Sequence, residues 1–250
     1  MGEGNTIEAT GLTRSFGERI AVDNISLCVE RGEVLGLLGV NGAGKSTTMD
    51  MLAGIQLPDK GEVFINNFSL SDQAMKARAC LGYLPEQPPV YPEMTVDEYL
   101  IYCAKLRRVA KQKILTAVDQ AKTRCGLDSN GKRLIKNLSK GYQQRIGIAQ
   151  AIVHGPDIVI LDEPTVGLDP VQIVEIRKLI RELGNDHSVI LSTHILPEVL
   201  TVCDRVIIVR QGKVVHEASI SAFDQKQFPA NETLEQIFIR LTCGDQEVIA

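Results

Sequence analysis

The sequence predicts an α/β fold with a mainly parallel sheet as its core, an antiparallel β layer near the N-terminus and an inserted helical subdomain. Three patterns lead to this prediction: apolar residues alternate within residues 7–29, continuous apolar runs recur later, and helical periodicity separates these runs. Alternation indicates strands with one buried face, whereas continuous runs are typical of strands buried on both faces. Strands that alternate with helices indicate a mainly parallel sheet. The continuous runs are "EVLGLLG", "DIVIL", "SVILS" and "RVIIV".

The individual elements can be placed from local signals. We expect two strands within residues 7–29, with turns around "SFGER" and "VDN". A helix should run from residue 44 to about 57, because Pro58 and the "PDKG" turn would end it. Amphipathic patterns in "TVDEYLIYCAKLRRV" and "KQKILTAVDQAKTRCG" predict the helices of the inserted subdomain, and "VQIVEIRKLIRELG" predicts a later helix with one apolar face.

The composition is that of a globular protein. With 250 residues, 44% of them hydrophobic and 23% charged, the chain can bury a large core. We expect one domain over residues 1–250, with residues 1–86 and 138–222 as the core, 87–137 as the helical subdomain and 223–250 as a tail. The net charge of −4 argues against a nucleic-acid partner.

Cysteine usage and the N-terminal segment both favour the cytoplasm. The six cysteines are scattered and lack metal-ligand spacing, so we expect small buried hydrophobic residues in a reducing compartment. The segment "MGEGNTIEAT" lacks the basic and apolar regions of a signal peptide, and no window is apolar over the length needed to cross a bilayer.

The segment "GVNGAGKST", residues 39–47, fits the spacing G-x-x-x-x-G-K-[ST] between a buried strand and a helix. This pattern is typical of the P-loop of nucleoside triphosphatases. Its glycines let successive N–H groups face a polyphosphate, Lys45 brings a mobile charge to the β- and γ-phosphates, and Ser46 offers an oxygen to Mg²⁺. The alternative is a glycine-rich turn that fits by chance. The residues expected to hold the nucleotide are Gly39, Asn41, Gly42, Ala43, Gly44, Lys45, Ser46 and Thr47, with Thr47 on the α-phosphate.

The segment "IVILDEP" brings two carboxylates to the end of a buried strand. Ligands of α/β sheets bind at the carboxyl ends of the strands. Asp162 can therefore hold the Mg²⁺ shell, and Glu163 can orient or deprotonate a water as general base. The alternative is a helix N-cap followed by an acidic residue in the first turn.

The segment "LSKGYQQR" places Ser139 and Gly141 where a helix should begin. A serine at an N-cap, with free N–H groups behind it, can receive an anion. The chain already has a better phosphate site in its P-loop, which raises the question of whose anion this second receptor binds. The simpler alternative is that Ser139 only caps the helix.

Together, "GVNGAGKST", "LSKGYQQR", "LDEPTVGLDP" and "LSTH" resemble, in order and approximate spacing, the motifs of nucleotide-binding subunits of ATP-binding cassette (ABC) transporters. The resemblance spans residues 7–218 and implies the ABC-ATPase form of the P-loop NTPase fold, with ATP and Mg²⁺ as cofactors. It also implies a head-to-tail dimer in which Ser139 and Gly141 contact the γ-phosphate of an ATP held by the other subunit. Lys140 and Tyr142 depart from the usual LSGGQ motif, standing in place of a glycine and the glutamine.

The same resemblance implies roles for three further residues. His194, in "LSTH", resembles the switch histidine that senses the γ-phosphate and is a catalytic candidate with Glu163 and Lys45. Asp169, in "GLDP", resembles the aspartate that couples the two sites across the dimer, although it could equally be a turn residue. Phe16 lies where the family has an aromatic residue that stacks on adenine, and the alternative is a core-filling phenylalanine.

The segment "GYLPEQPPVYPEMTV" resembles the loop that carries a metal-contacting glutamine in the family. Glu86 occupies that position here, and Gln87 follows it. Both side chains offer an oxygen that suits Mg²⁺, so both remain candidates. The loop also reads as a proline-rich hinge between the core and the helical subdomain.

The resemblance implies an ATP-hydrolysing subunit that powers a separate integral membrane permease from the cytoplasmic face of the plasma (inner) membrane. It would form a homodimer, or a heterodimer with a second ABC ATPase subunit. The C-terminal "ETLEQIFIRLT" resembles the tail of exporter-type subunits, which favours export. Two alternatives are a soluble ABC ATPase without a transport role and a nucleotide-gated binding module with little turnover.

Overall fold

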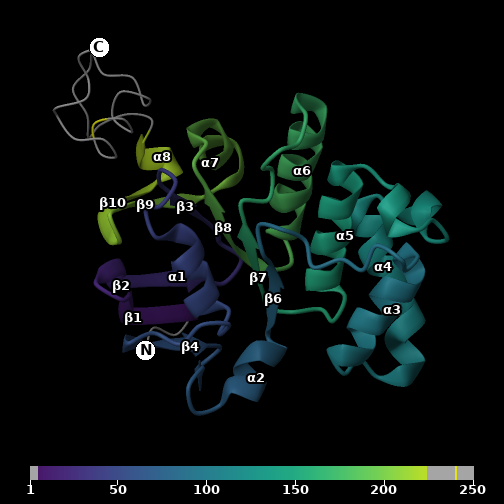
Figure 1. The fold of residues 1–250 in the computed structure, drawn as a ribbon, viewed down its shortest axis with the longest axis horizontal. Helices are drawn as coiled ribbons and strands as arrows, with labels where there is room; N and C mark the ends of the chain where they lie inside the picture. The colour runs from purple at the N-terminus through teal and green to yellow at the C-terminus, as the bar shows by residue number, and fades with distance from the viewer. Residues whose placement is uncertain (1–4, 224–239, 241–250) are drawn as a thin grey trace.

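The computed structural model describes residues 5–223 and residue 240, and in these residues two sheets are covered by helices (Figure 1). The larger sheet has six strands, and every neighbouring pair is parallel except the antiparallel pair at one edge. Its strands, in spatial order, are β10 (Lys213–Ser219), β9 (Arg205–Arg210), β3 (Val34–Leu38), β8 (Ser188–Thr193), β7 (Ile158–Asp162) and β6 (Leu81–Leu84). The predicted mainly parallel sheet is confirmed.

The smaller sheet is the predicted antiparallel layer. Its four strands, in spatial order, are β2 (Arg19–Glu30), β1 (Asn5–Phe16), β4 (Lys60–Ile65) and β5 (Phe68–Ser69). Helix α1 (Lys45–Leu52) contacts strands of both sheets and buries Met49, Met51 and Leu52. Because α1 begins directly after the P-loop, this packing fixes the loop between the two sheets.

The two faces of the larger sheet belong to separate apolar cores. Along β7, Ile158 and Ile160 pack with α1 and the smaller sheet, while Val159 and Leu161 pack with the helices on the other face. All four side chains are fully buried. A strand sends successive side chains to opposite faces, so a continuous apolar run is required where both faces are covered.

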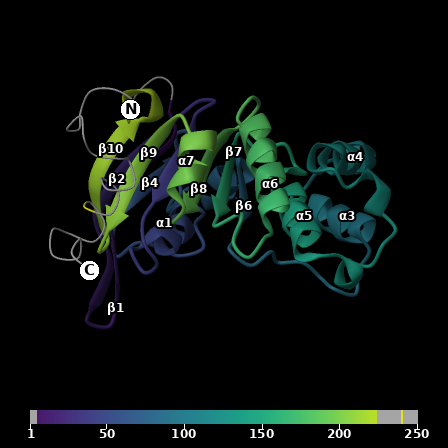
Figure 2. The ribbon, with the colours of Figure 1, turned by 90° about the horizontal axis from the view of Figure 1, so that it is seen from above.

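Three helices form a layer at the end of the molecule opposite the smaller sheet (Figure 2). They are α3 (Val96–Leu106), α4 (Ile114–Cys125) and α5 (Lys140–Ile152), which contact one another. Thr95 starts α3 with a capping box to Glu98, and Gly126, with a φ of 66°, ends α4. Short 3₁₀ turns connect these helices at Lys111–Lys113, Asp128–Asn130 and Ile135–Asn137.

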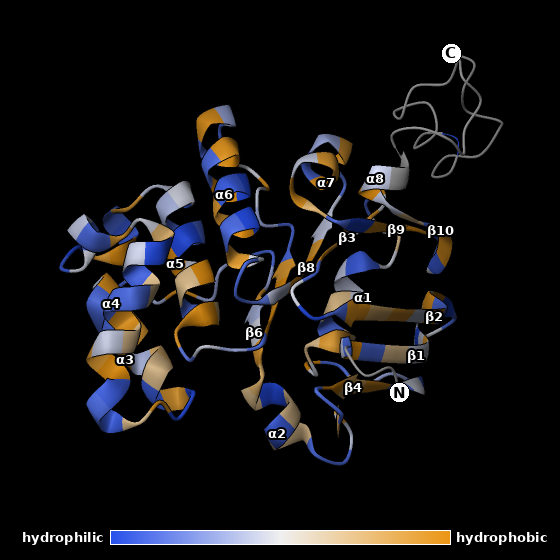
Figure 3. Ribbon diagram, turned by 180° about the vertical axis from the view of Figure 1, so that it is seen from behind, coloured by the Kyte–Doolittle hydropathy of each residue, from blue (hydrophilic) through white to orange (hydrophobic). Residues whose placement is uncertain are grey.

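The remaining helices cover the sheets. Helix α6 (Pro170–Leu183) buries the predicted apolar face through Ile176, Ile180 and Leu183. Figure 3 shows polar and apolar residues alternating around α6, in contrast to the apolar colour of the central strand β8. The others are α7 (Leu196–Val202), α2 (Ala74–Ala79) and α8 (Ile220–Phe223). Helices α2, α7 and α8 and strands β4 to β6 were not predicted from the sequence.

Two expected boundaries are wrong. The helix expected to reach residue 57 ends at Leu52, because Gly54 takes a φ of 68° and its carbonyl accepts a hydrogen bond from Arg78 at 2.6 Å. The expected turn at "VDN" is instead an irregular point inside β2, where Asn24 has a φ of 57°. The Asn24 N–H donates to Thr13 Oγ1 of the neighbouring strand β1 at 3.2 Å, and the pairing of β2 with β1 continues on both sides of Asn24.

The cysteine prediction is correct in part. Among the described residues, Cys103, Cys125 and Cys203 are buried, whereas Cys28 and Cys80 are half-buried, and all five thiols are free. None of the helices in the described part of the chain is long and apolar enough to cross a bilayer. The segment "ETLEQIFIRLT" lies, apart from Arg240, outside the described residues.

Candidate nucleotide-binding site

A cavity of about 600 Å³ lies beside the segments that follow β3, β7 and β8. These are the carboxyl ends of neighbouring parallel strands, where the sequence places its three strongest motifs. The predicted site residues that line this cavity are Phe16, Asn41, Gly42, Gly44, Lys45, Ser46, Thr47, Glu86, Glu163 and His194. Residues from five segments far apart in sequence are thus brought to one cavity.

The P-loop is held in shape by close backbone packing. Gly44, at the N-cap of α1, has a φ of 107°, and a Cβ there would lie 2.5 Å from the carbonyl oxygen of Ala21. A Cβ at Gly39 would lie 2.4 Å from the carbonyl oxygen of Val209. Both positions therefore require glycine for steric reasons that are independent of any ligand. Gly39 and the buried Ala43 support the loop from behind rather than line the cavity.

Lys45 lies inside the P-loop. Its Nζ donates to the carbonyl oxygens of Gly39 at 2.8 Å and Val40 at 3.3 Å, and lies 3.1 Å from Glu163 Oε1. The side chain is 5% exposed, so this ammonium interacts with protein groups rather than bulk water. A mobile cation at this point could reach the phosphates of a nucleotide in the loop.

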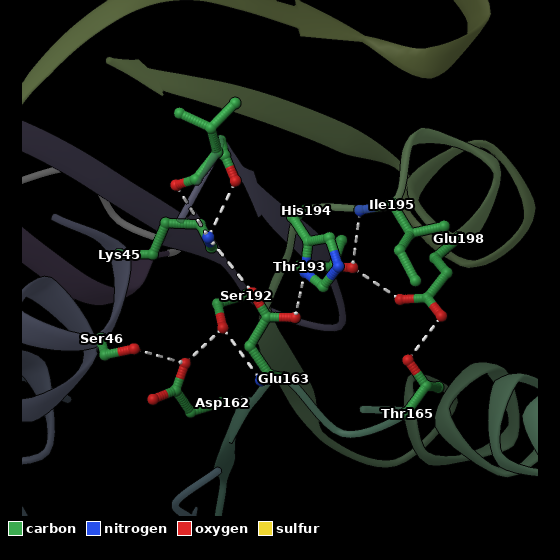
Figure 4. Close-up of polar contacts among 12 residues, drawn as sticks. Lys45, Ser46, Asp162, Glu163, Thr165, Ser192, Thr193, His194, Ile195 and Glu198 are labelled. Atoms are coloured by element: carbon green, nitrogen blue, oxygen red, sulfur yellow. Dashed lines mark hydrogen bonds and ion pairs between the residues drawn. The ribbon is translucent and has the colours of Figure 1, made fainter. Parts of the chain in front are cut away.

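Asp162 and Ser46, which lines the cavity, form an oxygen cluster (Figure 4). Ser46 Oγ donates to Asp162 Oδ1 at 3.3 Å, and Ser192 Oγ donates to the same oxygen in a very short contact. Burial is the main cause that raises the pKa of Asp162, while the hydrogen bonds from Ser192 and Ser46 lower it. Two ligands of an octahedral Mg²⁺ at about 2.1 Å from the metal lie about 3 Å apart, so these two oxygens fit one ion.

Glu163 projects from a sharp turn after β7. Its φ of 45° is in the left-handed region, which is costly for a residue with a side chain. Ser192 Oγ accepts the Glu163 N–H at 2.9 Å, and the N–H of Val166 donates back to the Glu163 carbonyl at 3.2 Å. These bonds support the turn, which directs the carboxylate toward Lys45 and His194 (Figure 4).

His194 follows β8 directly, as predicted. Its Nδ1 lies 2.9 Å from Glu163 Oε2, and its side chain is 38% exposed. The histidine therefore contacts the buried carboxylate with one ring nitrogen and stays accessible from the cavity. This geometry suits a group that responds to a ligand beside Glu163.

Phe16 and Glu86 lie at the rim of the cavity. Phe16 is 49% exposed at the end of β1, which excludes the core-filling alternative. The Arg14 guanidinium lies 5.3 Å from its ring centroid and is bonded to Asp59 at 2.7 Å, which orients the ring. Glu86 lines the cavity, whereas Gln87 is not among the lining residues that the structure describes.

Ser139, Gly141 and Asp169 are not among the described residues that line this cavity. Ser139 is the N-cap of α5 by backbone geometry. Its side chain is exposed and makes no capping hydrogen bond with the described residues. Gly141 is buried, and a Cβ there would come within 2.5 Å of the Gln172 amide. Asp169 is not a simple turn residue: it caps α6 by accepting the N–H of Gln172 at 2.9 Å.

The sequence reasoning missed several residues of this region, among them Ser192, Arg19 and Glu198. Ser192 is part of "LSTH" and binds both Asp162 and the Glu163 N–H, so its position next to a motif was the available signal. Arg19 lines the cavity, near Gly42 of the P-loop, and nothing in its local sequence marks it. Glu198 is 1% exposed and lies behind His194, and its burial is visible only in the fold.

Residues 22–166 match the family model described as ABC transporter, which is more than half of the chain. The chain belongs to the ABC transporter family. As a member, it binds ATP and is an ATPase, the ATP-binding subunit of a transporter. The predicted family, fold class and enzymatic activity are thereby confirmed.

Named relatives of this ABC subunit have transport functions. It is 38% identical to the bacitracin transport ATP-binding protein BcrA of Bacillus licheniformis over 215 residues, 84% of this chain and 69% of that one. It is 34% identical to the ABC transporter ATP-binding protein NatA of Bacillus subtilis over 239 residues, 93% of this chain and 96% of that one. Among solved structures, cbiO1 from Clostridium perfringens, part of the ABC transporter complex cbiONQ, matches with a TM-score of 0.80 and 27% identity, covering 96% of both chains.

Proposed function

We propose that this ABC subunit forms a head-to-tail dimer on ATP, with another copy or a close relative, and powers a separate membrane permease. One observation carries the dimer: the described residues gather a P-loop, Glu163 and His194 around one cavity, with Asp162 bonded to Ser46 beside it, while Ser139 lies elsewhere on an exposed helix start. Within the described part of the chain the Ser139 hydroxyl makes no capping bond, and the N–H groups that open this 13-residue helix suit an anion. A phosphate held by another subunit supplies that anion.

Within each site, the residues have separable roles. The P-loop and Lys45 hold the triphosphate, and Phe16 stacks on the base with its free face. Mg²⁺ suits the oxygens of Ser46 and Asp162, with Glu86 at the rim, and supplies charge neutralisation of the phosphates. Glu163 orients and deprotonates the attacking water, because its carboxylate is buried, directed into the cavity and held by two partners.

His194 and Asp169 connect the site to the dimer. His194 contacts Glu163 with one nitrogen and senses the γ-phosphate with its accessible edge. Asp169 lies at the end of the loop that begins at Glu163, so a shift of one alters the other. ATP then stabilises the closed dimer and hydrolysis releases it, a ligand-biased switch.

The dimer is tested by mixing two inactive variants. Lys45→Ala weakens nucleotide binding by its own P-loop, and Ser139→Glu brings a negative charge to the proposed phosphate contact. In a head-to-tail pair, the P-loop of the Ser139→Glu chain meets the intact "LSKGYQQR" segment of the Lys45→Ala chain. Random pairing then restores about a quarter of wild-type turnover, because half of the dimers carry one intact site of two.

The control is Ser129→Glu, which adds the same charge at an exposed serine elsewhere in the helical layer. It should hydrolyse ATP at the wild-type rate alone. If mixing the two inactive variants gives no recovery although they form mixed dimers on a sizing column with ATP, each chain completes its own site and the shared-site proposal fails.

The location and direction of transport are part of the same proposal. We place the subunit at the cytoplasmic face of the plasma (inner) membrane, with export as the direction, which the resemblance of "ETLEQIFIRLT" to the tail of exporter-type subunits supports. Purification of the tagged chain from membranes should retain an integral membrane protein, and reconstitution of the pair should raise ATP turnover. Equal turnover with and without that protein would favour an ATPase that acts on its own.

A further inference from the structure

Glu198 is a buried carboxylate that the proposed chemistry does not use. It lies in α7, four residues after His194, and it is 1% exposed. Burial of an ionised carboxylate is costly unless its oxygens receive hydrogen bonds. The contacts of Glu198 therefore indicate what the burial achieves.

Its two oxygens hold two threonine hydroxyls from different segments (Figure 4). Thr165 Oγ1 donates to Glu198 Oε1 at 2.5 Å, and Thr193 Oγ1 donates to Oε2 at 2.7 Å. Arg177 Nη2 is more distant from Oε1, at 3.4 Å, and its buried Nε has no partner among the described residues. The ion pair is thus longer than the two hydroxyl bonds.

The two threonines flank the two residues that form the proposed reaction centre. Thr165 follows Glu163 by two residues and lies within the turn closed by the Val166 N–H. Thr193 immediately precedes His194 and accepts the N–H of Ile195 at 3.0 Å. One carboxylate therefore joins the backbone segment of the proposed base to that of the histidine beside it.

A second tie lies on the opposite face of the same strand end. Ser192 binds Asp162 and the Glu163 N–H, and the next residue, Thr193, binds Glu198. Successive residues of β8 point to opposite faces, so the strand end is fixed from both sides. The 2.9 Å contact between Glu163 and His194 joins the same two chain segments that these ties connect.

The chemistry of the tie requires a carboxylate. Both threonine hydroxyls donate, so both oxygens of residue 198 must accept. A glutamine offers only one accepting oxygen, and an alanine leaves both hydroxyls without their partner. The residue type is therefore specified by its two contacts rather than by the space it fills.

We propose that Glu198 is a positioning residue that holds Glu163 and His194 at reacting distance by tying Thr165 to Thr193. The inference rests on the proposed roles of Glu163 and His194. It concerns the alignment of the pair and leaves the P-loop untouched. Loss of the tie should therefore lower kcat and leave the KM for ATP within about twofold, since a misplacement near 1 Å costs on the order of 10²-fold in rate.

The test is a double-mutant cycle on the full chain. Glu198→Ala should lower kcat by about 10- to 100-fold in the wild-type background. In a His194→Ala background the pair no longer exists, so the same substitution should cost at most about threefold. Val199→Ala is the matched control: it removes buried atoms from the next residue of α7 and should act equally in both backgrounds.

Thr165→Val and Thr193→Val keep the proposal testable if Glu198→Ala does not fold, since each removes one hydroxyl from a side chain of similar shape. Each should lower kcat, and Glu198→Gln should fall between wild type and Glu198→Ala. Equal losses from Glu198→Ala in both backgrounds, or no loss in kcat, would overturn the inference. If Glu163→Gln and His194→Ala themselves retain wild-type turnover, the proposed site fails instead.

Discussion

The Nζ atom of Lys45 lies 3.1 Å from Glu163 Oε1, with the two side chains only 5% and 7% exposed. The other oxygen of the same carboxylate lies 2.9 Å from His194 Nδ1. Glu163 therefore contacts both Lys45, which should hold the phosphates, and His194, which should sense them. A phosphate oxygen that takes the Lys45 ammonium would free one oxygen of Glu163, which links ATP binding to the readiness of the base.

Replacing Lys45 with alanine should weaken ATP binding by about 10- to 100-fold, because a hydrogen bond to a charged group contributes about 1.5–3 kcal/mol. Isothermal titration of the purified chain with ATP measures the effect. Lys178→Ala, at an exposed lysine of α6, is the control and should bind like wild type. Unchanged affinity in Lys45→Ala would contradict the role given to the P-loop lysine.

Glu163→Gln should lower turnover by about 10²- to 10⁴-fold, the contribution of a positioned general base. It also removes the negative charge beside Lys45 and the phosphates, so ATP should bind at least as tightly and the dimer should persist. Size-exclusion chromatography with ATP measures the dimer, and a phosphate-release assay measures turnover. A variant that hydrolyses at the wild-type rate would show that another group is the base.

Ser192→Ala should lower both stability and activity. The substitution leaves the buried Glu163 N–H without its acceptor, a loss of about 1–3 kcal/mol in the free energy of unfolding. Because that N–H belongs to a turn with a positive φ, the carboxylate should also lose its orientation. The free energy of unfolding, measured in urea, and kcat should therefore both fall. Ser71→Ala, at an exposed serine, should change neither.

The fold could be predicted where the pattern of the sequence records the environment of each element. The apolar runs of β3, β7, β8 and β9 reflect two covered faces, and they are strands as expected. Strand β6 is only four residues long and its run is interrupted by Gly82, so it carries too little periodicity to be recognised. The end of α1 depends on the contact between Gly54 and Arg78, which is distant in sequence.

The candidate site shows the same division. Residues within a contiguous motif, such as Lys45 and Glu163, could be predicted because the motif itself contains the geometry. Arg19 and Glu198 belong to the site through contacts with segments distant in sequence, and the bonds of Ser192, although it lies in "LSTH", depend on β8 lying beside β7. Contacts between segments leave no local spacing, so they appear only once the sheet order is known.

Glu86 and Gln87 can be separated by paired alanine variants. Of these two residues, only Glu86 is among the described residues that line the cavity. Glu86→Ala should therefore lower Mg²⁺-dependent turnover, by about 10-fold for one weakened ligand contact. Gln87→Ala is its natural control and should remain near wild type. Titration of turnover with Mg²⁺ checks this, and the reverse order of the two variants would assign the metal contact to Gln87.

Stability should fall in acid because of His154. Its Nε2 contacts the carbonyl oxygen of Leu81 at 3.2 Å, and burial, with the nearby Arg107, lowers its pKa from 6.5 to about 4. Between these two pH values the unfolded chain binds a proton at His154 that the folded chain does not bind. The contribution of neutral His154 to the free energy of unfolding is therefore fully present above pH 6.5 and is lost as the pH falls toward 4. His154→Gln keeps a donor for Leu81 and should reduce that loss by about 1–3 kcal/mol. Burial also lowers the pKa of His187, which therefore accounts for part of the remaining pH dependence of the free energy of unfolding. Urea unfolding of both proteins across this pH range measures the difference, and parallel curves would show that His154 does not titrate as its burial requires.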